Sequence, residues 1–276
     1  MQMTAYCEFP EAEGSRCAVY GASRPNRASK LSAHRAPAAG KVCPRALALW
    51  AAIMLVMLLS VPSSGAAAVK PGREEGEFRI YSGGKEVGNE KFVIVSTADA
   101  SSSTSILQFR NPVGGHEKIL LETRLEMGPQ YHPRRYELKS DVNGQKGTIL
   151  GAFNPNQAIF EYMNGAAARK SGLLVGDKFT LLDTNIFHHF IFLVRLFDFD
   201  GKGKPQKFEV AIPQEPDSGF LQISEVKPET ITVRGKKVET RHLQVDSGTL
   251  LVDLWVDHQR ILYKIAVKSK DIEVIR

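Results

Sequence analysis

Cysteine is scarce in this sequence, and all of it lies near the start. The three cysteines are Cys7, Cys17 and Cys43, so residues 69–276 contain none. That part of the chain therefore has no disulfide and no thiol nucleophile. It also lacks a serine within a Gly-x-Ser-x-Gly sequence and a glycine-rich phosphate loop, the usual marks of an α/β-hydrolase and of a nucleotide-binding protein. The sequence predicts no catalytic residue and no cofactor.

Residues 1–45 have no apolar periodicity and few acids. They carry seven Lys or Arg against three Glu, and Gly, Ala, Ser, Arg and Pro dominate, which predicts a disordered basic leader. Because 45 residues are long for the basic part of a signal peptide, the sequence allows two interpretations of its start, the first being translation from Met1. Translation beginning later, for example at Val42, is the alternative.

An uncharged apolar run at 46–61 follows directly after Arg45. Pro62 breaks it, and Ala66-Ala67-Ala68 comes next. A basic flank, an apolar core and an Ala-x-Ala site predict a signal peptide over 46–68, cleaved near Ala68 to give a periplasmic or secreted protein. An N-terminal membrane anchor is the alternative, although about 16 apolar residues fall short of the roughly 20 that a bilayer span needs. Membrane contact is expected only through the uncleaved signal.

Net charge gives no indication of a nucleic-acid partner. The chain has a formal net charge of +6, but the leader alone contributes +4, from seven basic and three acidic residues. Residues 69–276 keep only +2, and this small charge does not favour nucleic-acid binding. About 208 residues are enough for one domain with its own core. We therefore expect a single mainly-β domain over 69–276, with no indication of its oligomeric state.

Short alternating segments separated by turn residues fill most of that domain. Phe78 and Ile80 precede a Gly83-Gly84 hairpin signal, and Asn143-Gly144 marks a second tight turn. The same pattern resumes after residue 205 and continues to the end. We expect roughly twelve strands in a large, strongly curved antiparallel sheet whose apolar face needs a cover.

The expected cover is the apolar stretch Leu181–Phe199. Asp183 or Thr184 is suited to cap a helix of about 12 residues beginning at Ile186, and apolar side chains occupy most of its circumference. A helix that is apolar nearly all round is buried. At 1.5 Å per residue it spans only about 18 Å, too short to cross a membrane. The fold class is α+β, mainly β: a half-open barrel wrapped around one apolar helix.

Three local patterns resemble a recurrent group of secreted bacterial proteins. They are the opening stretch 81–88 (YSGGKEVG), the Leu-Leu-Asp step at 181–183, and the closing hairpin, in which Trp255-Val256-Asp257 ends a strand and 261–265 returns apolar. The chain from residue 76 onward is similar to the DUF3108 and DUF6134 type, and more distantly to the LolA/LolB half-barrel lipoprotein carriers. The resemblance implies a half-open barrel wrapped on a helix, and it implies no catalytic residues.

Histidines are the residues best suited to chemistry in this domain. His188 and His189 are adjacent, so on a helix their side chains point about 100° apart and cannot share one metal ion as i, i+4 histidines can. No histidine or carboxylate stands four positions from either, so we expect no metal site. The segment 198–203 superficially resembles a calcium loop but lacks the closing glutamate.

Two classes of function, with a third alternative, follow from these patterns. The first is a non-catalytic secreted or periplasmic module that binds a hydrophobic, lipid-like small molecule in a concave apolar cavity between the curved sheet and the helix. Its expected ligand-binding residues are His188, His189, Phe192 and Trp255. The second is an envelope hydrolase, which would need a histidine, a carboxylate and a nucleophile within hydrogen-bond reach in a cleft. The third is a structural or assembly factor that offers a sheet edge to a partner strand.

Overall fold

The computed structural model describes residues 71–110, 117–201 and 203–276. The expected leader, signal peptide and cleavage point lie outside these residues. The described part forms one sheet of fifteen strands, one α-helix and two short 3-10 turns. No helix in these ranges is both long and apolar enough to cross a bilayer. The mainly-β fold class expected from the sequence is confirmed.

The bounds of the elements follow the hairpin signals closely. In chain order they are β1 Gly72–Ser82, β2 Lys85–Ser96, β3 Ser101–Arg110, β4 Lys118–Met127, η1 Pro129–Tyr131, β5 Pro133–Val142, β6 Gln145–Asn154, β7 Gln157–Asn164, β8 Ala167–Leu174, β9 Phe179–Leu181, α2 His189–Leu196, β10 Gln206–Ile212, β11 Asp217–Val233, β12 Lys236–Asp246, β13 Leu251–Val256, β14 Leu262–Val267, η2 Lys268–Lys270 and β15 Ile272–Ile275.

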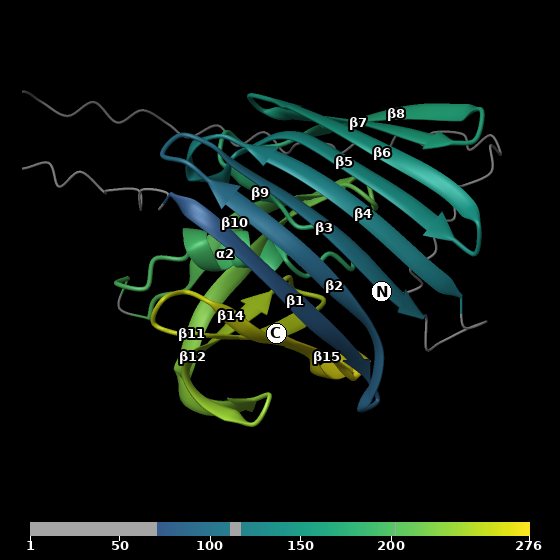
Figure 1. Ribbon diagram of the computed structural model, residues 1–276. Coiled ribbons are helices and arrows are strands. Elements are labelled where there is room, and N and C mark those ends of the chain that lie inside the picture. The colour runs from purple at the N-terminus through teal and green to yellow at the C-terminus, as the bar shows by residue number, and fades with distance from the viewer. Residues whose placement is uncertain (1–70, 111–116, 202) are drawn as a thin grey trace, which may run out of the picture. The chain divides into compact units, whose positions relative to one another are not determined.

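The sheet consists of two meanders joined through the first and last strands. Strands β8 back to β1 pair in reverse chain order, β1 pairs with β15, and β15 back to β10 continue the sheet. Arg79 faces Ile275 and Ile80 faces Val274 across the β1–β15 junction. All pairs are antiparallel except β9 with β10, which is parallel. Figure 1 shows the long strands β1 to β6 running side by side, with α2 at the left of the view.

The sheet curls until its two edges approach each other. Strands β8 and β9 are the two edges, yet only residues 175–178 separate them in the chain. A link of this length spans at most about 17 Å. In agreement, β8 contacts β11, and β9 contacts β5 and α2. All three residues of β9 are buried, whereas β8 is largely exposed. The result is a half-open barrel.

The apolar face of the sheet and α2 form one core. Phe78, Phe160, Ile191, Phe192 and Leu193 all have at most 1% of their surface exposed. Strand residues at every second position point inward, as in β4, where the burial pattern alternates along the whole strand. The helix therefore covers the sheet as the sequence predicted.

The start of the helix differs from the prediction. The α-helix begins at His189 rather than Ile186, and the segment before it forms single turns, with the Phe190 N–H donating to the Phe187 carbonyl at 3.1 Å. The prediction that Asp183 or Thr184 caps the helix was wrong. His188 holds the cap position without a side-chain bond, and Glu90 of β2 accepts from the backbone N–H groups of Phe187 and His188, just before the helix begins.

Candidate functional site

A groove lies on the face of the sheet that points away from the core. It has a volume of about 770 Å³ and is lined by residues of β11 to β15, η2 and the β1–β2 hairpin. The floor of the groove is formed by strand residues that alternate with core residues and therefore point to the opposite face of the sheet. In β13, Val252, Leu254 and Val256 belong to the core, so Asp253 and Trp255 between them face outward. The outer face of these strands therefore lines the groove, while their inner face packs in the hydrophobic core.

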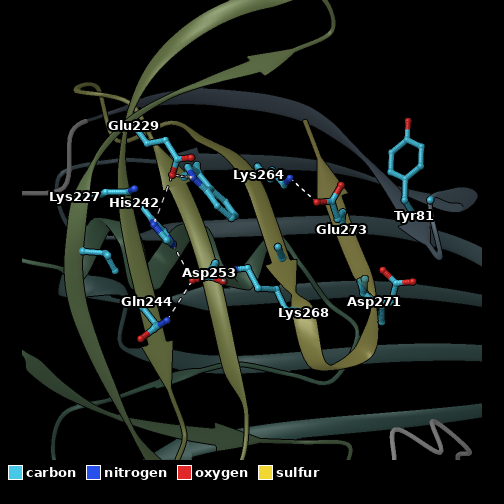
Figure 2. Close-up of a pocket in the computed structure, with 15 residues that line it drawn as sticks. Tyr81, Lys227, Glu229, His242, Gln244, Asp253, Lys264, Lys268, Asp271 and Glu273 are labelled. Atoms are coloured by element: carbon cyan, nitrogen blue, oxygen red, sulfur yellow. Dashed lines mark hydrogen bonds and ion pairs between the residues drawn. The ribbon is translucent and has the colours of Figure 1, made fainter.

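His242 of β12 connects the two outward residues of β13. Its ring stacks on the Trp255 indole with centroids 4.7 Å apart and planes 6° apart. Its Nε2 lies 2.8 Å from Asp253 Oδ1, and Lys268 Nζ lies 2.9 Å from Asp253 Oδ2. Figure 2 shows these side chains converging from neighbouring strands. The carboxylate of Asp253 thus accepts from both partners, and Gln244 Nε2 donates to its Oδ1 at 3.4 Å as a third.

The charge of Asp253 follows from these contacts. Burial by itself raises the pKa of this carboxyl, but the hydrogen bonds from Lys268 and His242 outweigh that effect and lower it. Asp253 is therefore ionised at neutral pH. An ionised carboxylate only accepts, so the proton in the His242–Asp253 contact sits on His242 Nε2. Its Nδ1 is buried and has no hydrogen-bond partner among the described residues.

Trp255 is enclosed although it faces away from the core, with only 7% of its surface exposed. Its Nε1–H donates to Glu229 Oε2 at 3.0 Å. Lys264 Nζ lies 5.1 Å from the centre of its indole ring and pairs with Glu273 at 2.5 Å. The tryptophan is therefore held by a histidine stack, a hydrogen bond and a cation–π contact.

A second polar cluster lies inside the core, at the start of α2. Glu90 and His188 are fully buried, and His188 Nδ1 lies 2.6 Å from Glu90 Oε1. The other oxygen of Glu90 accepts from the backbone N–H groups of Phe187 and His188, at 2.9 and 3.1 Å. His188 Nε2 lies 3.2 Å from Ser103 Oγ. Glu90 therefore satisfies two buried amides of the turn that leads into the helix.

Asp183 and His189 form the other half of this buried cluster. Asp183 accepts from the Tyr136 hydroxyl at 2.5 Å and from the backbone of Thr184 and Gln214 at 2.9 Å each. Burial raises the pKa of Asp183 to about 6, despite these hydrogen bonds. The Asp183 N–H donates to His189 Nδ1 at 3.2 Å, so the proton of the neutral His189 ring sits on Nε2. Burial, then the nearby His188, holds the pKa of His189 well below its usual value.

The structure divides the predicted ligand-binding residues between two places. His188, His189 and Phe192 lie together in the core, with ring centroids 4.6 to 6.3 Å apart. Trp255 lies in the outer groove with His242. Across the described ranges, no group of three or more His, Cys, Asp or Glu is placed to hold a metal ion.

Sequence reasoning missed Glu90, His242 and Asp253. One signal for Glu90 was present: it shares its strand face with Phe92 and Ile94, so the alternation puts a carboxylate at an inward position. For His242 and Asp253, nothing in the local sequence indicated that the two side chains would meet. They come together because β12 pairs with β13 in a register that sets His242 opposite Trp255 and Gln244 opposite Asp253.

No protein-family model matches the chain, and no curated protein matches it. The solved structures that match the chain include the following two. One is a β-barrel-like protein of the domain of unknown function DUF1849 from Brucella abortus, with a TM-score of 0.49 and 10% identity over 75% of this chain and 96% of that one. The other is a DUF1089 family protein from Pseudomonas aeruginosa, with a TM-score of 0.42 and 12% identity over 66% and 90%. The resemblance to the DUF3108, DUF6134 and LolA/LolB types stays a prediction.

Proposed function

We propose that residues 71–276 form a non-catalytic binding module of the bacterial cell envelope, and that its ligand is a small lipid-like molecule with a polar head. The observation that carries this proposal is the groove of about 770 Å³ beside Trp255. Its volume lies within the range of about 300–1,000 Å³ typical of small-molecule sites. The sequence predicted Trp255 as a ligand-binding residue, and Trp255 is one of the residues that line the groove.

The composition of the groove supports an amphipathic ligand. Its apolar lining comes from five residues: Tyr81, Val226, Trp255, Ala266 and Ile272. The charged residues of the floor are paired with one another, Lys268 with Asp253 and Lys264 with Glu273. A ligand that covers the apolar wall can leave these pairs intact, and its polar head can remain among the charged groups at the rim. This division suits an alkyl chain with a compact head group.

The geometry of His242 supports binding rather than hydrolysis. A general base needs a ring nitrogen within reach of its substrate. Nε2 of His242 is taken by Asp253, and Nδ1 is buried and lies 3.8 Å from Glu229. The residues that line the groove include no serine, threonine or cysteine. The histidine–carboxylate pair therefore has neither an accessible base nor a neighbouring nucleophile.

The exposed edge gives less support to a strand-accepting assembly factor. Strand β8 is the open edge, and Arg169 and Lys170 occupy its middle. Charged residues on an edge strand oppose the addition of another strand. The envelope location rests on the expected signal peptide. N-terminal sequencing of the exported protein tests it: a mature terminus near residue 69 supports the proposal, and a cytoplasmic protein that keeps residues 46–68 contradicts it.

The binding proposal is tested with a defined amphiphile. Monomeric dodecylphosphocholine is titrated into the full-length protein, with binding followed by calorimetry, and decanoic acid and decylamine are tested in parallel to resolve the preferred head group. Val226→Glu places a charge on the apolar wall and is expected to weaken binding at least tenfold, about 1.4 kcal/mol. Leu251→Glu is the matched control, because Leu251 is similarly exposed (48% against 50%) but does not line the groove. Equal affinities for the two variants, or no binding of any of the three amphiphiles, would overturn the proposal.

A further inference from the structure

The far part of the β11–β12 hairpin extends beyond the sheet as a two-stranded arm, residues 227–240. Strand β10 pairs with β11 only over 217–223, and β13 pairs with β12 only over 241–246. Between these limits, within the described chain, the two strands pair only with each other and turn at Arg234-Gly235, where both φ angles are positive. An isolated two-stranded hairpin is only marginally stable. Contacts outside the arm must therefore hold it in place.

The base of the arm contains a bend. The pairing register of β11 with β12 shifts between Glu225 and Lys227, which marks a β-bulge. A bulge bends its strand and increases the local twist. Val226, the extra residue of this bulge, and Lys227 and Glu229 beyond it form one wall of the groove. A change of angle at this bulge would move that wall relative to the floor.

One face of the arm is turned inward. Its alternate residues are at least partly buried, while the residues between them are exposed. The covered residues are Glu229, Ile231, Val233, Val238 and Thr240, and the exposed ones include Thr230, Thr232, Lys237 and Glu239. Val233 lies outside the main core cluster but is only 7% exposed. The arm therefore has one covered face and one exposed face.

Among the residues that the structure describes, one side-chain hydrogen bond ties the arm to the floor of the groove. It is the bond from Trp255 Nε1–H to Glu229 Oε2, at 3.0 Å. Glu229 is the innermost covered residue of the arm, and 39% of its side chain is exposed. Figure 2 shows Glu229 and His242 joined by a dashed line, which marks the 3.8 Å contact of His242 Nδ1 with the same carboxylate. On this outward side of the sheet, Glu229 and the stacked His242 ring are two of the contacts that cover Trp255.

We propose that the arm is a lid over the groove, hinged at the Glu225–Lys227 bulge and latched by the Trp255–Glu229 hydrogen bond. The inference rests on the proposed function, since it describes how a ligand enters and leaves that groove. When the latch breaks, the arm swings away from Trp255 and the groove opens. When the latch re-forms, the arm closes over the bound molecule. Elements with few packing contacts open more readily than the core, as this role requires.

The latch is tested first without ligand, using Trp255 as the reporter. The chain has two tryptophans, so Trp50→Phe in the full-length protein leaves Trp255 as the single fluorophore. In that background Glu229→Ala is expected to raise the acrylamide quenching constant of Trp255 at least threefold. Glu239→Ala is the control, since it removes the same charge from the exposed face of the same arm. Equal quenching in the two variants would overturn the latch.

The gating role is tested with stopped-flow binding of monomeric dodecylphosphocholine. A lid that must open first slows both entry and exit, so Glu229→Ala is expected to raise the association and dissociation rates together, each at least fivefold, with a smaller change in Kd. Binding at unchanged rates would overturn the lid and leave the binding proposal intact. Failure of the probe to bind either protein counts against the proposed function. In that case the quenching comparison still decides whether the arm opens.

Discussion

The rings of His242 and Trp255 lie parallel, 4.7 Å apart, on the side of the sheet that faces away from the core. Around them the domain places two carboxylates, Asp253 and Glu229, and two lysines, Lys264 and Lys268. These polar contacts hold a tryptophan at the surface of the barrel without exposing it. Several consequences of this arrangement, and of the buried cluster beside α2, are open to measurement.

Truncation of Trp255 separates its packing from its hydrogen bond. Trp255→Phe keeps an aromatic ring against His242 but loses the donor to Glu229, a bond to a charged group worth about 1.5–3 kcal/mol. Trp255→Ala also loses the stack and the buried surface, so we expect a loss of about 3–5 kcal/mol. Urea unfolding followed by circular dichroism measures both. Equal losses for the two variants would show that packing contributes nothing.

Removal of Glu90 leaves His188 and two backbone amides buried without their acceptor. We expect Glu90→Leu to cost about 3–5 kcal/mol, the range found when one partner of a buried pair is deleted. The double variant Glu90→Leu with His188→Phe should cost clearly less than the sum of the single changes, because the orphaned ring is then gone. Strict additivity in chemical denaturation would contradict the coupling.

Because the pKa of Asp183 is raised in the folded protein, we expect this residue to make the free energy of unfolding fall as pH rises. Its folded pKa of about 6 lies above its usual value of 3.8, so between these limits the folded protein holds more protons than the unfolded chain. The free energy of unfolding from this group therefore decreases across that window, by about 3 kcal/mol in order of magnitude. Asp183→Asn should abolish this slope in unfolding titrations from pH 3.5 to 7. An unchanged slope would rule Asp183 out as its source.

We expect His189 to have the opposite effect, so that the free energy of unfolding rises with pH. Because burial and the neighbouring His188 lower its folded pKa, the unfolded chain takes up a proton below pH 6.5 while the folded ring does not. Stability from this group therefore falls as pH drops below about 6.5. His189→Asn keeps an acceptor near Nδ1 for the Asp183 N–H and should flatten the acid side of the curve. A matching curve for wild type and variant would contradict this origin.

Much of the fold could be predicted because local patterns determine it. The Gly83-Gly84 and Asn143-Gly144 turns separate strands as expected, and the apolar stretch at 186–197 packs inside the sheet. The strand count of roughly twelve fell short of fifteen. Short or weakly patterned strands, such as β9 and β15, depend on pairing partners that lie far away in the chain.

The candidate site was predictable only in part, because it depends on long-range register. Trp255 could be singled out as a large aromatic residue at a strand end. Its partners could not, since Glu229 and His242 reach it through strand pairing and through the bend in β11. Asp183 shows the same limit: its spacing fits a helix cap, but Tyr136, 47 positions earlier, binds its carboxylate instead.

The β1–β15 junction has a consequence for how this chain folds. These strands lie next to each other in the middle of the sheet, yet nearly 200 residues separate them in the chain. Contacts between such distant segments make folding slow, because a large loop must close before they form. While β15 is still being synthesised, β1 has a row of unpaired amides and carbonyls and cannot complete the barrel. We therefore expect the barrel to close only after β15 has been synthesised, whereas strands β1 to β8, which pair with their neighbours in the chain, can form earlier.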